Sequence, residues 1–216
     1  MSREEPLTRD SDVTRKRILA AVGDLLAREG FQGIGINAVA RKAGVDKVLI
    51  YRYFGGLPQL LRAFARQGEL WPTIGQLLGR KLTEIGGMEV RDLSVALMKG
   101  LLRELRKRVT TQEVLRWELV QRNELTDELA AVREAQGTEV LDLLPAAAGS
   151  TGDRDLGAMG ALLHAGVMYL VLRSRTADGF MGVDLQSDEG CSRIEGAIES
   201  LAKAWFRALR VCVGGV

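Results

Sequence analysis

Apolar residues recur every three or four positions along most of this chain, which is the spacing of helices that bury one face. Residues 57–64 show the pattern clearly, and their apolar positions are Leu57, Leu60, Leu61 and Phe64. Pro72 is expected to interrupt that helix, because proline cannot donate the hydrogen bond of a helix interior. A long amphipathic helix is predicted from about residue 92 to residue 108.

The middle of the chain also favours helices. Thr110 and Glu113 have the spacing of a capping box, in which two side chains bond to backbone N–H groups at the start of a helix. Thr126 is predicted to begin a further helix that ends before Pro145, and residues 145–153 have the composition of a loop. No segment shows the alternation that is typical of strands. The fold class is therefore predicted to be all-α.

The last two predicted helices carry unusually large apolar surfaces. Between residues 156 and 176 apolar side chains occur almost all round the helix, so this helix must be buried. Ser187 can cap the final helix, whose apolar stripe is formed by Ile194, Ile198, Leu201, Trp205 and Leu209. One copy of so small a domain could hardly cover both surfaces, which favours pairing with a second copy. Packing of both helices as ordinary core is the alternative.

Residues 30–54 carry the most specific pattern in the chain. Ala40 lies on the inner face of a first short helix, where its small side chain lets a second helix cross closely. Gly44 suits a sharp turn, because glycine takes a positive φ at no steric cost. Asp46 can cap a second short helix that runs to about Phe54. This order of elements is typical of a helix-turn-helix.

The second short helix has two distinct faces. Ile50 and either Tyr53 or Phe54 are predicted to be buried, at three-to-four spacing. The other face presents side chains that suit phosphates and base edges, namely Lys47, Val48, Tyr51 and Arg52. The same order of elements occurs in ordinary all-α proteins, so the spacing alone does not separate DNA binding from plain packing.

The segment VDKVLIYRYFGGLPQLL, residues 45–61, adds a resemblance to a known family. It resembles the recognition helix and the following helix of the TetR family of one-component transcriptional regulators, whose pattern is roughly A-G-V-S-x-x-x-L-Y-x-Y-F-x-x-K-x-x-L. The matching residues are Ala43, Gly44, Val45, Ile50, Tyr51, Tyr53, Phe54 and Leu60. The resemblance covers about residues 12–66. It implies an N-terminal three-helix DNA-binding domain of the helix-turn-helix type, followed by a larger helical domain for ligand binding and dimerisation.

The resemblance also implies a mode of action. The helices at 156–176 and 188–210 would pair with their copies across a two-fold axis, and each recognition helix would enter a major groove of a palindromic operator. A ligand would change the separation of the two DNA-binding heads by tilting the helix that starts at Leu57. The residues expected to contact DNA are Gly35, Asn37, Lys47, Val48, Leu49, Tyr51, Arg52 and Tyr53.

Three residues depart from the family pattern. Gly35 stands where threonine usually opens the first short helix, so a hydroxyl contact to phosphate is replaced by at most a backbone N–H. Leu57 stands where a lysine commonly opens the next helix, which removes another phosphate contact. Leu49 replaces a small hydroxyl residue, so Val48 and Leu49 could instead touch thymine methyl groups.

Charge is divided unevenly along the chain. The whole chain carries a net charge of +2, yet residues 1–66 hold 12 Lys and Arg against 7 Asp and Glu, while residues 67–216 hold 18 against 21. The positive charge therefore lies where the helix-turn-helix is predicted. Three cations near the start of the first helix oppose its dipole, and either a nearby phosphate or a solvated basic face would explain them; they are Arg15, Lys16 and Arg17.

The domain organisation follows from these patterns. We predict a disordered tail at residues 1–11, the DNA-binding domain at 12–66, and the ligand-binding and dimerisation domain at 67–216. The chain is 46% hydrophobic, has no run of 18 apolar residues, and begins with a stretch too polar for a signal peptide. A cytoplasmic protein that does not enter the membrane is therefore expected.

Residues with catalytic or metal-binding chemistry are scarce. The two cysteines, Cys191 and Cys212, and the single histidine, His164, provide neither a structural zinc site nor a Ser-His or Cys-His catalytic pair. We therefore predict no catalytic residue, no metal ligand and no cofactor.

The larger domain contains side chains that could line a cavity for an apolar or amphipathic ligand, although each also suits ordinary core. They are Trp71, Met98, Trp117, His164, Met168 and Tyr169. The function expected is that of a homodimeric repressor, released from operator DNA by such a ligand. The main alternative is a helical small-molecule-binding module without DNA-binding activity. An enzyme is a distant third, because no general acid and base pair is discernible.

Overall fold

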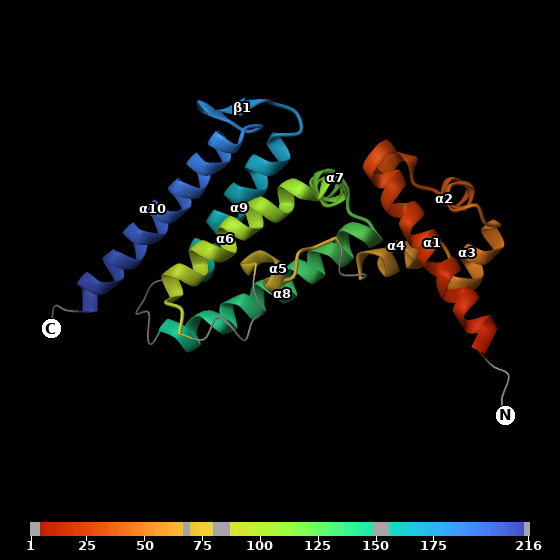
Figure 1. Ribbon diagram of the computed structural model, residues 1–216, viewed down its shortest axis with the longest axis horizontal. Helices are drawn as coiled ribbons and strands as arrows, with labels where there is room; N and C mark the ends of the chain where they lie inside the picture. The colour runs from red at the N-terminus through yellow and green to blue at the C-terminus, as the bar shows by residue number, and fades with distance from the viewer. Residues whose placement is uncertain (1–4, 67–69, 80–86, 149–155, 214–216) are drawn as a thin grey trace. The chain divides into compact units, whose positions relative to one another are not determined.

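The computed structural model describes residues 5–66, 70–79, 87–148 and 156–213 (Figure 1). Its contacts divide the chain into two compact units. The N-terminal unit contains residues 1–71 and 109–132, and the C-terminal unit contains residues 72–108 and 133–216. The regular secondary structure of the described residues is helical apart from one short hairpin, which confirms the all-α fold class.

The N-terminal unit contains the predicted helix-turn-helix. Its elements are α1 (Glu5–Glu29), the 3-10 helix η1 (Phe31–Gly33), α2 (Ile36–Ala43), α3 (Lys47–Phe54), α4 (Leu57–Ala65), α7 (Val109–Glu118) and the first part of α8 (Glu124–Ala148). α1 packs against α2, α4, η1 and α7, while α3 packs against α2 and α4. The core of the unit is formed by apolar side chains of these helices, among them Ile18, Val22, Leu26, Ile50 and Leu60.

The start of α1 differs from the sequence pattern. The helix begins at Glu5, so it includes most of the stretch 1–11 that we predict to be a disordered tail. Pro6 falls in its first turn, where the N–H that proline lacks would have no helical partner. The polar composition that suggested a tail does not prevent a helix. The domain boundary after residue 66 stays a prediction; contacts also group residues 109–132 with the N-terminal unit.

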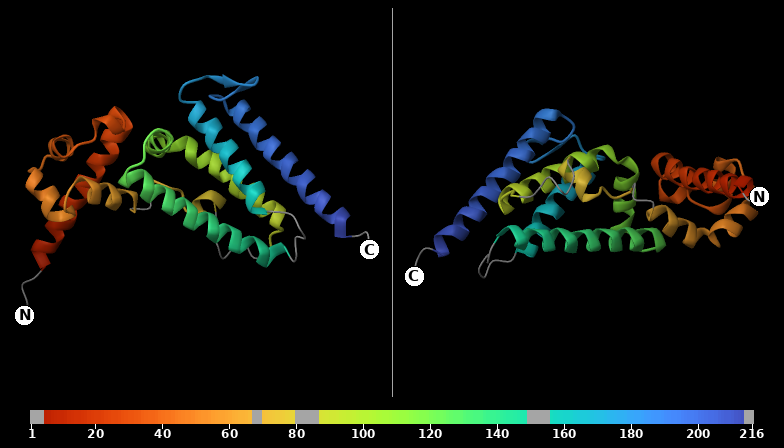
Figure 2. Two further views of the ribbon diagram at one scale, coloured as in Figure 1. Left: turned by 180° about the vertical axis from the view of Figure 1, so that it is seen from behind. Right: turned by 60° about the horizontal axis from the view of Figure 1, so that its bottom comes forward.

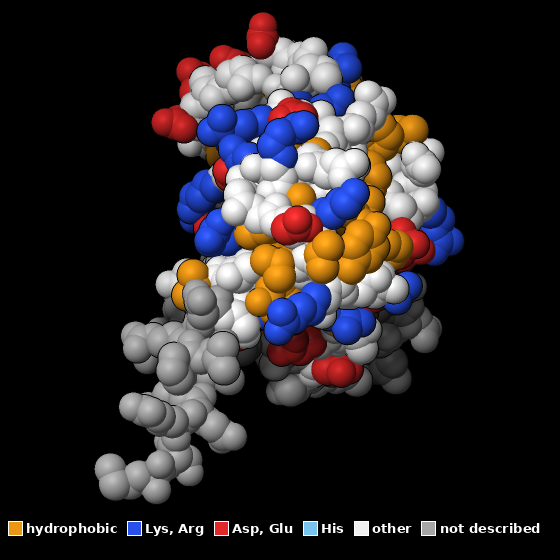
Figure 3. All heavy atoms as spheres, turned by 90° about the vertical axis from the view of Figure 1, so that its right-hand side faces the viewer, with side chains coloured by type: hydrophobic (Ala, Val, Ile, Leu, Met, Phe, Trp, Pro, Cys, Tyr) orange, Lys and Arg blue, Asp and Glu red, His pale blue; other side chains and the backbone are white. Residues whose placement is uncertain are grey.

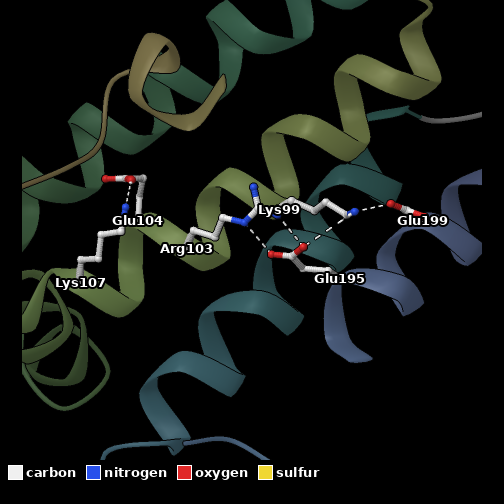
Figure 4. A network of polar contacts seen from close by, with 6 residues as sticks. All are labelled: Lys99, Arg103, Glu104, Lys107, Glu195 and Glu199. Carbon is white, nitrogen blue, oxygen red and sulfur yellow. Dashed lines mark hydrogen bonds and ion pairs between the residues drawn. The ribbon is translucent and has the colours of Figure 1, made fainter. Parts of the chain in front are cut away.

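The C-terminal unit is built around α6. Its elements are α5 (Ile74–Leu78), α6 (Val90–Lys107), residues 133–148 of α8, α9 (Leu156–Arg173), β1 (Gly179–Phe180), β2 (Val183–Asp184) and α10 (Asp188–Val213). α6 packs against α5, α9 and α10, and Figure 2 gives two further views of this arrangement. Ion pairs join α6 to α10, with Arg103 on Glu195 at 2.6 Å and Lys99 on Glu199 (Figure 4).

Three local expectations were wrong. Strands were not predicted, yet β1 and β2 form an antiparallel hairpin in which Phe180 lies opposite Val183; two residues per strand are too few to show alternation. Thr110 lies inside α7, so it does not cap that helix. α8 continues past Pro145, and it begins after Asn123, whose Oδ1 accepts hydrogen bonds from the N–H groups of Leu125 and Thr126.

The two most apolar helices leave much of their surface uncovered within the unit. On α9, Val167 and Val171 are buried, but Leu162 is 73% exposed and Tyr169 51% exposed. On α10, Ser187 accepts a hydrogen bond from the Gly190 N–H as the predicted cap. Its stripe buries Ile194 and Ile198, whereas Leu201 is 51% exposed. α9 is long and apolar enough to cross a bilayer, but apolar helices of soluble proteins meet the same criterion of length and composition.

Candidate DNA-binding surface

The candidate reading surface is the outer face of α3. Asp46 Oδ1 accepts a hydrogen bond from the Val48 N–H at 2.8 Å, which fixes the start of the helix as predicted. Ile50 and Phe54 are buried, and Tyr53 is half-buried. The predicted outer residues Lys47, Val48, Tyr51 and Arg52 are all exposed. Val48 is 62% exposed and Tyr51 53% exposed, so two large apolar surfaces face solvent beside two cations.

The turn before α3 has the geometry that its sequence predicts. Gly44 has a φ of 63° in the left-handed region, and the Val45 N–H donates back to the carbonyl of Ala40 at 3.0 Å. A residue with a side chain would be strained there, and a Cβ at Gly44 would lie 3.3 Å from Arg17 Nη2. The sharp turn places the N-terminus of α3 beside the end of α2.

The start of α2 is the second part of the candidate surface. Gly35 is its N-cap with a φ of −168°, which is extended backbone that any residue can adopt, and it supplies no side-chain capping bond. Nothing lies within 4 Å of the position that a Cβ would take. Asn37, the second residue of α2, is exposed. The N-terminal end of α2 therefore offers backbone N–H groups to an anion, but no side-chain hydroxyl at Gly35.

The remaining predicted contact residues are less open. Leu49 and Tyr53 are half-buried, and the Arg52 guanidinium lies 5.7 Å from the centroid of the Tyr53 ring. This cation–π contact holds Arg52 along the outer face of α3. Leu57, which replaces the expected lysine, is half-buried at the start of α4. The structure thus gathers all eight predicted DNA-contact residues in the N-terminal unit, on α2, α3 and the residue before α2.

The cations of this unit fall into two groups. Arg62 and Arg66 pair with Glu128, and Lys42 pairs with Asp24. In contrast, Arg41, Lys47 and Arg52 form no ion pair with any residue that the structure describes. Figure 3 views the molecule from the side of α2 and α3, and Lys and Arg side chains lie there around a band of hydrophobic side chains. A surface of this kind suits a polyanion that also presents apolar groups, as DNA does.

Arg15 and Arg17 have roles that the sequence did not reveal. Both donate to backbone carbonyls at the ends of helices: Arg15 Nη1 to Tyr53 O at 2.8 Å, and Arg17 Nη2 to Ala43 O at 2.7 Å. From the sequence, a nearby phosphate or a solvated basic face was expected to explain these cations. Their partners lie 26 to 38 residues away in the sequence, so local spacing could not indicate them. Lys16, between the two, is exposed.

The predicted ligand residues are divided between the two units. Trp71 and Trp117 belong to the N-terminal unit, where Trp71 is buried. Met98 is half-buried on α6, and α9 carries the half-buried His164 and Met168 and the exposed Tyr169. The Tyr169 ring packs edge-on against Phe180, with centroids 5.3 Å apart. The assignment of these residues to a ligand stays a prediction.

His164 is the titratable member of that group. Burial lowers the pKa of its imidazole, and the positive charge of Arg133 lowers it further. The side chain is therefore neutral near pH 7 and can act as both a donor and an acceptor of hydrogen bonds. Among the described residues no group of three His, Cys, Asp or Glu side chains could hold a metal ion.

Comparisons with known proteins agree with this geometry. Residues 18–64 match the family model for bacterial regulatory proteins of the tetR family. A search of curated proteins found no match. A TetR-family transcriptional regulator from Rhodococcus sp. has a similar solved structure, with a TM-score of 0.65 and 23% identity over 88% of this chain and 98% of that one.

Two further solved structures are similar. The regulator FadR from Bacillus subtilis, solved in complex with stearoyl-CoA, has a TM-score of 0.62 and 17% identity, over 87% of this chain and 96% of that one. A transcriptional regulator from Streptomyces coelicolor A3(2) has a TM-score of 0.59 and 24% identity, over 88% and 98%. At such identities the similarity is one of fold, and it extends across both units.

Proposed function

Because residues 18–64 belong to the TetR family of bacterial regulatory proteins, we propose that this chain is a homodimeric repressor that reads a palindromic operator and leaves it when a small ligand binds. The chain has the fold of a DNA-binding transcriptional regulator. The observation that carries the proposal is the outer face of α3, where Lys47, Val48, Tyr51 and Arg52 are exposed together. A regulator of this kind acts on the chromosome, hence in the cytoplasm.

Each side chain of that face has a role in the proposal. Lys47 and Arg52 donate to phosphates or to the acceptor edge of guanine, and Tyr51 donates its hydroxyl to a phosphate. Val48 provides an apolar contact for a thymine methyl group. Gly35 and Asn37 approach a phosphate at the start of α2, where the backbone N–H groups point outward.

The proposed dimer forms through α9 and α10. Leu162 and Tyr169 on α9, and Leu201 on α10, expose apolar surface that a single chain leaves in contact with water. Burial of such surface is the main driving force for stable association of two chains. Packing of α9 as ordinary core, the alternative left open by its sequence, is less favoured because only Val167 and Val171 are buried on this helix.

The proposed ligand is an apolar or amphipathic molecule that binds in the C-terminal unit. Support comes from the half-buried Met98, His164 and Met168 on helices that pack together, and from the acyl-CoA bound by the B. subtilis regulator. In this proposal His164 is the polar anchor, since its neutral imidazole can pair with a carbonyl or a hydroxyl. Ligand binding must favour a conformation in which the two DNA-binding heads are misplaced.

DNA binding can be tested without knowledge of the operator. The purified protein is used to select duplexes from a random-sequence library, and the selected duplex is then titrated. Lys47→Ala or Tyr51→Ala should weaken its binding by about 1 to 3 kcal/mol while the protein stays folded. Arg28→Ala is the matched control, because Arg28 is an exposed cation in the last turn of α1, roughly 16 Å along the helix from Arg17. If the wild type enriches no duplex and shows no salt-dependent binding, the helical small-molecule-binding module becomes the better interpretation.

A further inference from the structure

Two arginines of α1 hold the C-terminal ends of both helix-turn-helix helices. Arg17 Nη2 donates to the carbonyls of Ala43 at 2.7 Å and Gly44 at 3.1 Å, which close α2. Arg15 Nη1 donates to the carbonyl of Tyr53 at 2.8 Å, in the last turn of α3. The last carbonyls of a helix lack partners within the helix and carry partial negative charge, so a guanidinium group is favoured at the C-terminal end of α2 and at that of α3.

Arg15 makes a second contact that fixes its position. Its guanidinium carbon lies 4.7 Å from the centroid of the Phe54 ring, and Phe54 is buried beneath it. The side chain is thus held by a hydrogen bond at one edge and by an aromatic face below. An arginine that is fixed in this way joins α1 to the end of α3.

We propose that Arg15 and Arg17 are positioning residues, which set the angle of α3 for DNA recognition and do not themselves bind phosphate. The inference rests on the proposed DNA-binding function. Both guanidinium groups already donate to carbonyls of the protein, although Arg17, like Lys16, is exposed. Lys16, between them, makes no hydrogen bond or ion pair with the described residues. Three adjacent cations therefore divide into two that bond to helix-end carbonyls and one that bonds to no described residue.

The expected effect on affinity follows from populations. Without the hydrogen bonds of Arg15 or Arg17, α3 samples orientations that do not fit the DNA major groove. The apparent Kd for DNA then rises by the inverse of the fraction of molecules in which α3 is correctly oriented. A hydrogen bond from a charged group is strong enough that its loss should lower this fraction about 10-fold or more. The number of phosphates neutralised in the complex does not change.

Salt dependence separates this role from phosphate binding. A cation that binds a phosphate contributes about one unit to the slope of log K against log salt concentration, whereas a positioning residue contributes none. Arg15→Gln and Arg17→Gln should therefore weaken binding about 10-fold or more at every salt concentration, with the wild-type slope. Lys47→Gln should lower the slope by about one unit, and Lys16→Gln serves as the control for an exposed charge on α1.

The experiment titrates these variants with a duplex selected from a random-sequence library by the wild type. It is paired with amide hydrogen exchange of the free protein, which needs no DNA. Arg15→Gln should speed exchange of the Gly55 amide, which bonds to Tyr51 O, and Arg17→Gln that of the Val45 amide, which bonds to Ala40 O. Lys16→Gln should change neither. If a glutamine variant does not fold, the Arg→Lys variant, which keeps the charge but has a single donating nitrogen, replaces it and should show a smaller effect in the same direction.

Two results would overturn the inference. A slope lowered by about one unit in the Arg15 or Arg17 variants would assign a phosphate contact to that residue. Unchanged affinity together with unchanged amide exchange would remove the positioning role. If the wild type selects no duplex at all, the proposed function fails, and the exchange data alone then decide whether the arginines hold α2 and α3.

Discussion

The indole ring of Trp117 packs against the ring of Phe31, with their centroids 5.6 Å apart and their planes tilted by 44°. Trp117 lies on α7 and Phe31 on η1, directly after α1. The indole Nε1–H also donates to Glu113 Oε1 at 3.1 Å, which fixes the ring from its polar edge. A residue that the sequence suggested as a ligand contact thus holds α7 against the end of α1.

This pair predicts an energetic coupling. In a double-mutant cycle of Phe31→Leu and Trp117→Leu, we expect a coupling free energy of about 0.5 to 1.5 kcal/mol, because tilted aromatic pairs stabilise beyond their buried area. Urea unfolding of the two single variants and of the double variant measures it. Additive effects of the two substitutions would mean that the rings contribute only separate burial.

The helix-turn-helix could be predicted because its signals are local. Gly44 and Asp46 mark the turn and the start of α3 within three residues, and the bounds Lys47–Phe54 were confirmed. The roles of Arg15, Arg17 and Trp117 could not be predicted in this way. Each depends on a contact with a residue far away in the sequence, which neither spacing nor composition indicates.

The roles of the predicted ligand residues could not be assigned from the sequence either. Large apolar side chains such as Trp71 and Met98 suit a cavity and a core equally well, so residue type alone cannot assign them. Trp71 is buried in the N-terminal unit, and Met98 lies in the other unit. The apolar character of α9 could be predicted from the sequence, but whether another part of the same chain covers this helix depends on the complete fold.

Gly35 provides a test of the contact that the chain lacks. Gly35→Thr should strengthen operator binding and leave the salt slope unchanged, because the added hydroxyl can donate to a phosphate at the start of α2 but carries no charge that would displace a counterion. The backbone there is extended and nothing lies within 4 Å of the new Cβ, so the substitution fits. Gly35→Ala is the matched control, since it adds the Cβ without the hydroxyl. Equal affinities of the two variants would show that no phosphate approaches this position.

The ion pairs between α6 and α10 predict a dependence of stability on pH. The hydrogen bond from Lys99 lowers the pKa of the Glu199 carboxyl below its ordinary value of 4.5 (Figure 4). A carboxyl whose pKa is lower in the folded state stabilises the fold above the unfolded pKa and loses this contribution as the pH falls through the folded pKa. Glu199→Gln should therefore unfold at lower urea than the wild type at pH 7.

That difference should shrink once the pH falls below 4.5, and vanish in stronger acid. Glu139→Gln is the control, because Glu139 is exposed on α8 and forms no ion pair with the described residues. The urea midpoint of each variant is measured from pH 7 downward. A difference that stays constant across this range would assign the effect of Glu199→Gln to packing and not to charge.

The exposed apolar residues of α9 and α10 predict how the dimer can be broken without unfolding the chain. Leu162 is 73% exposed and Leu201 51% exposed, so glutamate at either position meets water in a single chain but enters the apolar interface of the proposed dimer. Leu162→Glu and Leu201→Glu should thus give folded monomers at concentrations where the wild type is dimeric. Val13→Glu is the matched control, because Val13 is equally exposed, at 51%, but lies on α1. Sedimentation over a range of concentrations gives the dissociation constants, and circular dichroism checks the fold.

Since a palindrome is read by two DNA-binding domains held together in a dimer, the monomeric variants should also lose most operator affinity. A wild type that sediments as a monomer, or glutamate variants that remain dimers, would show that α9 and α10 do not form the interface.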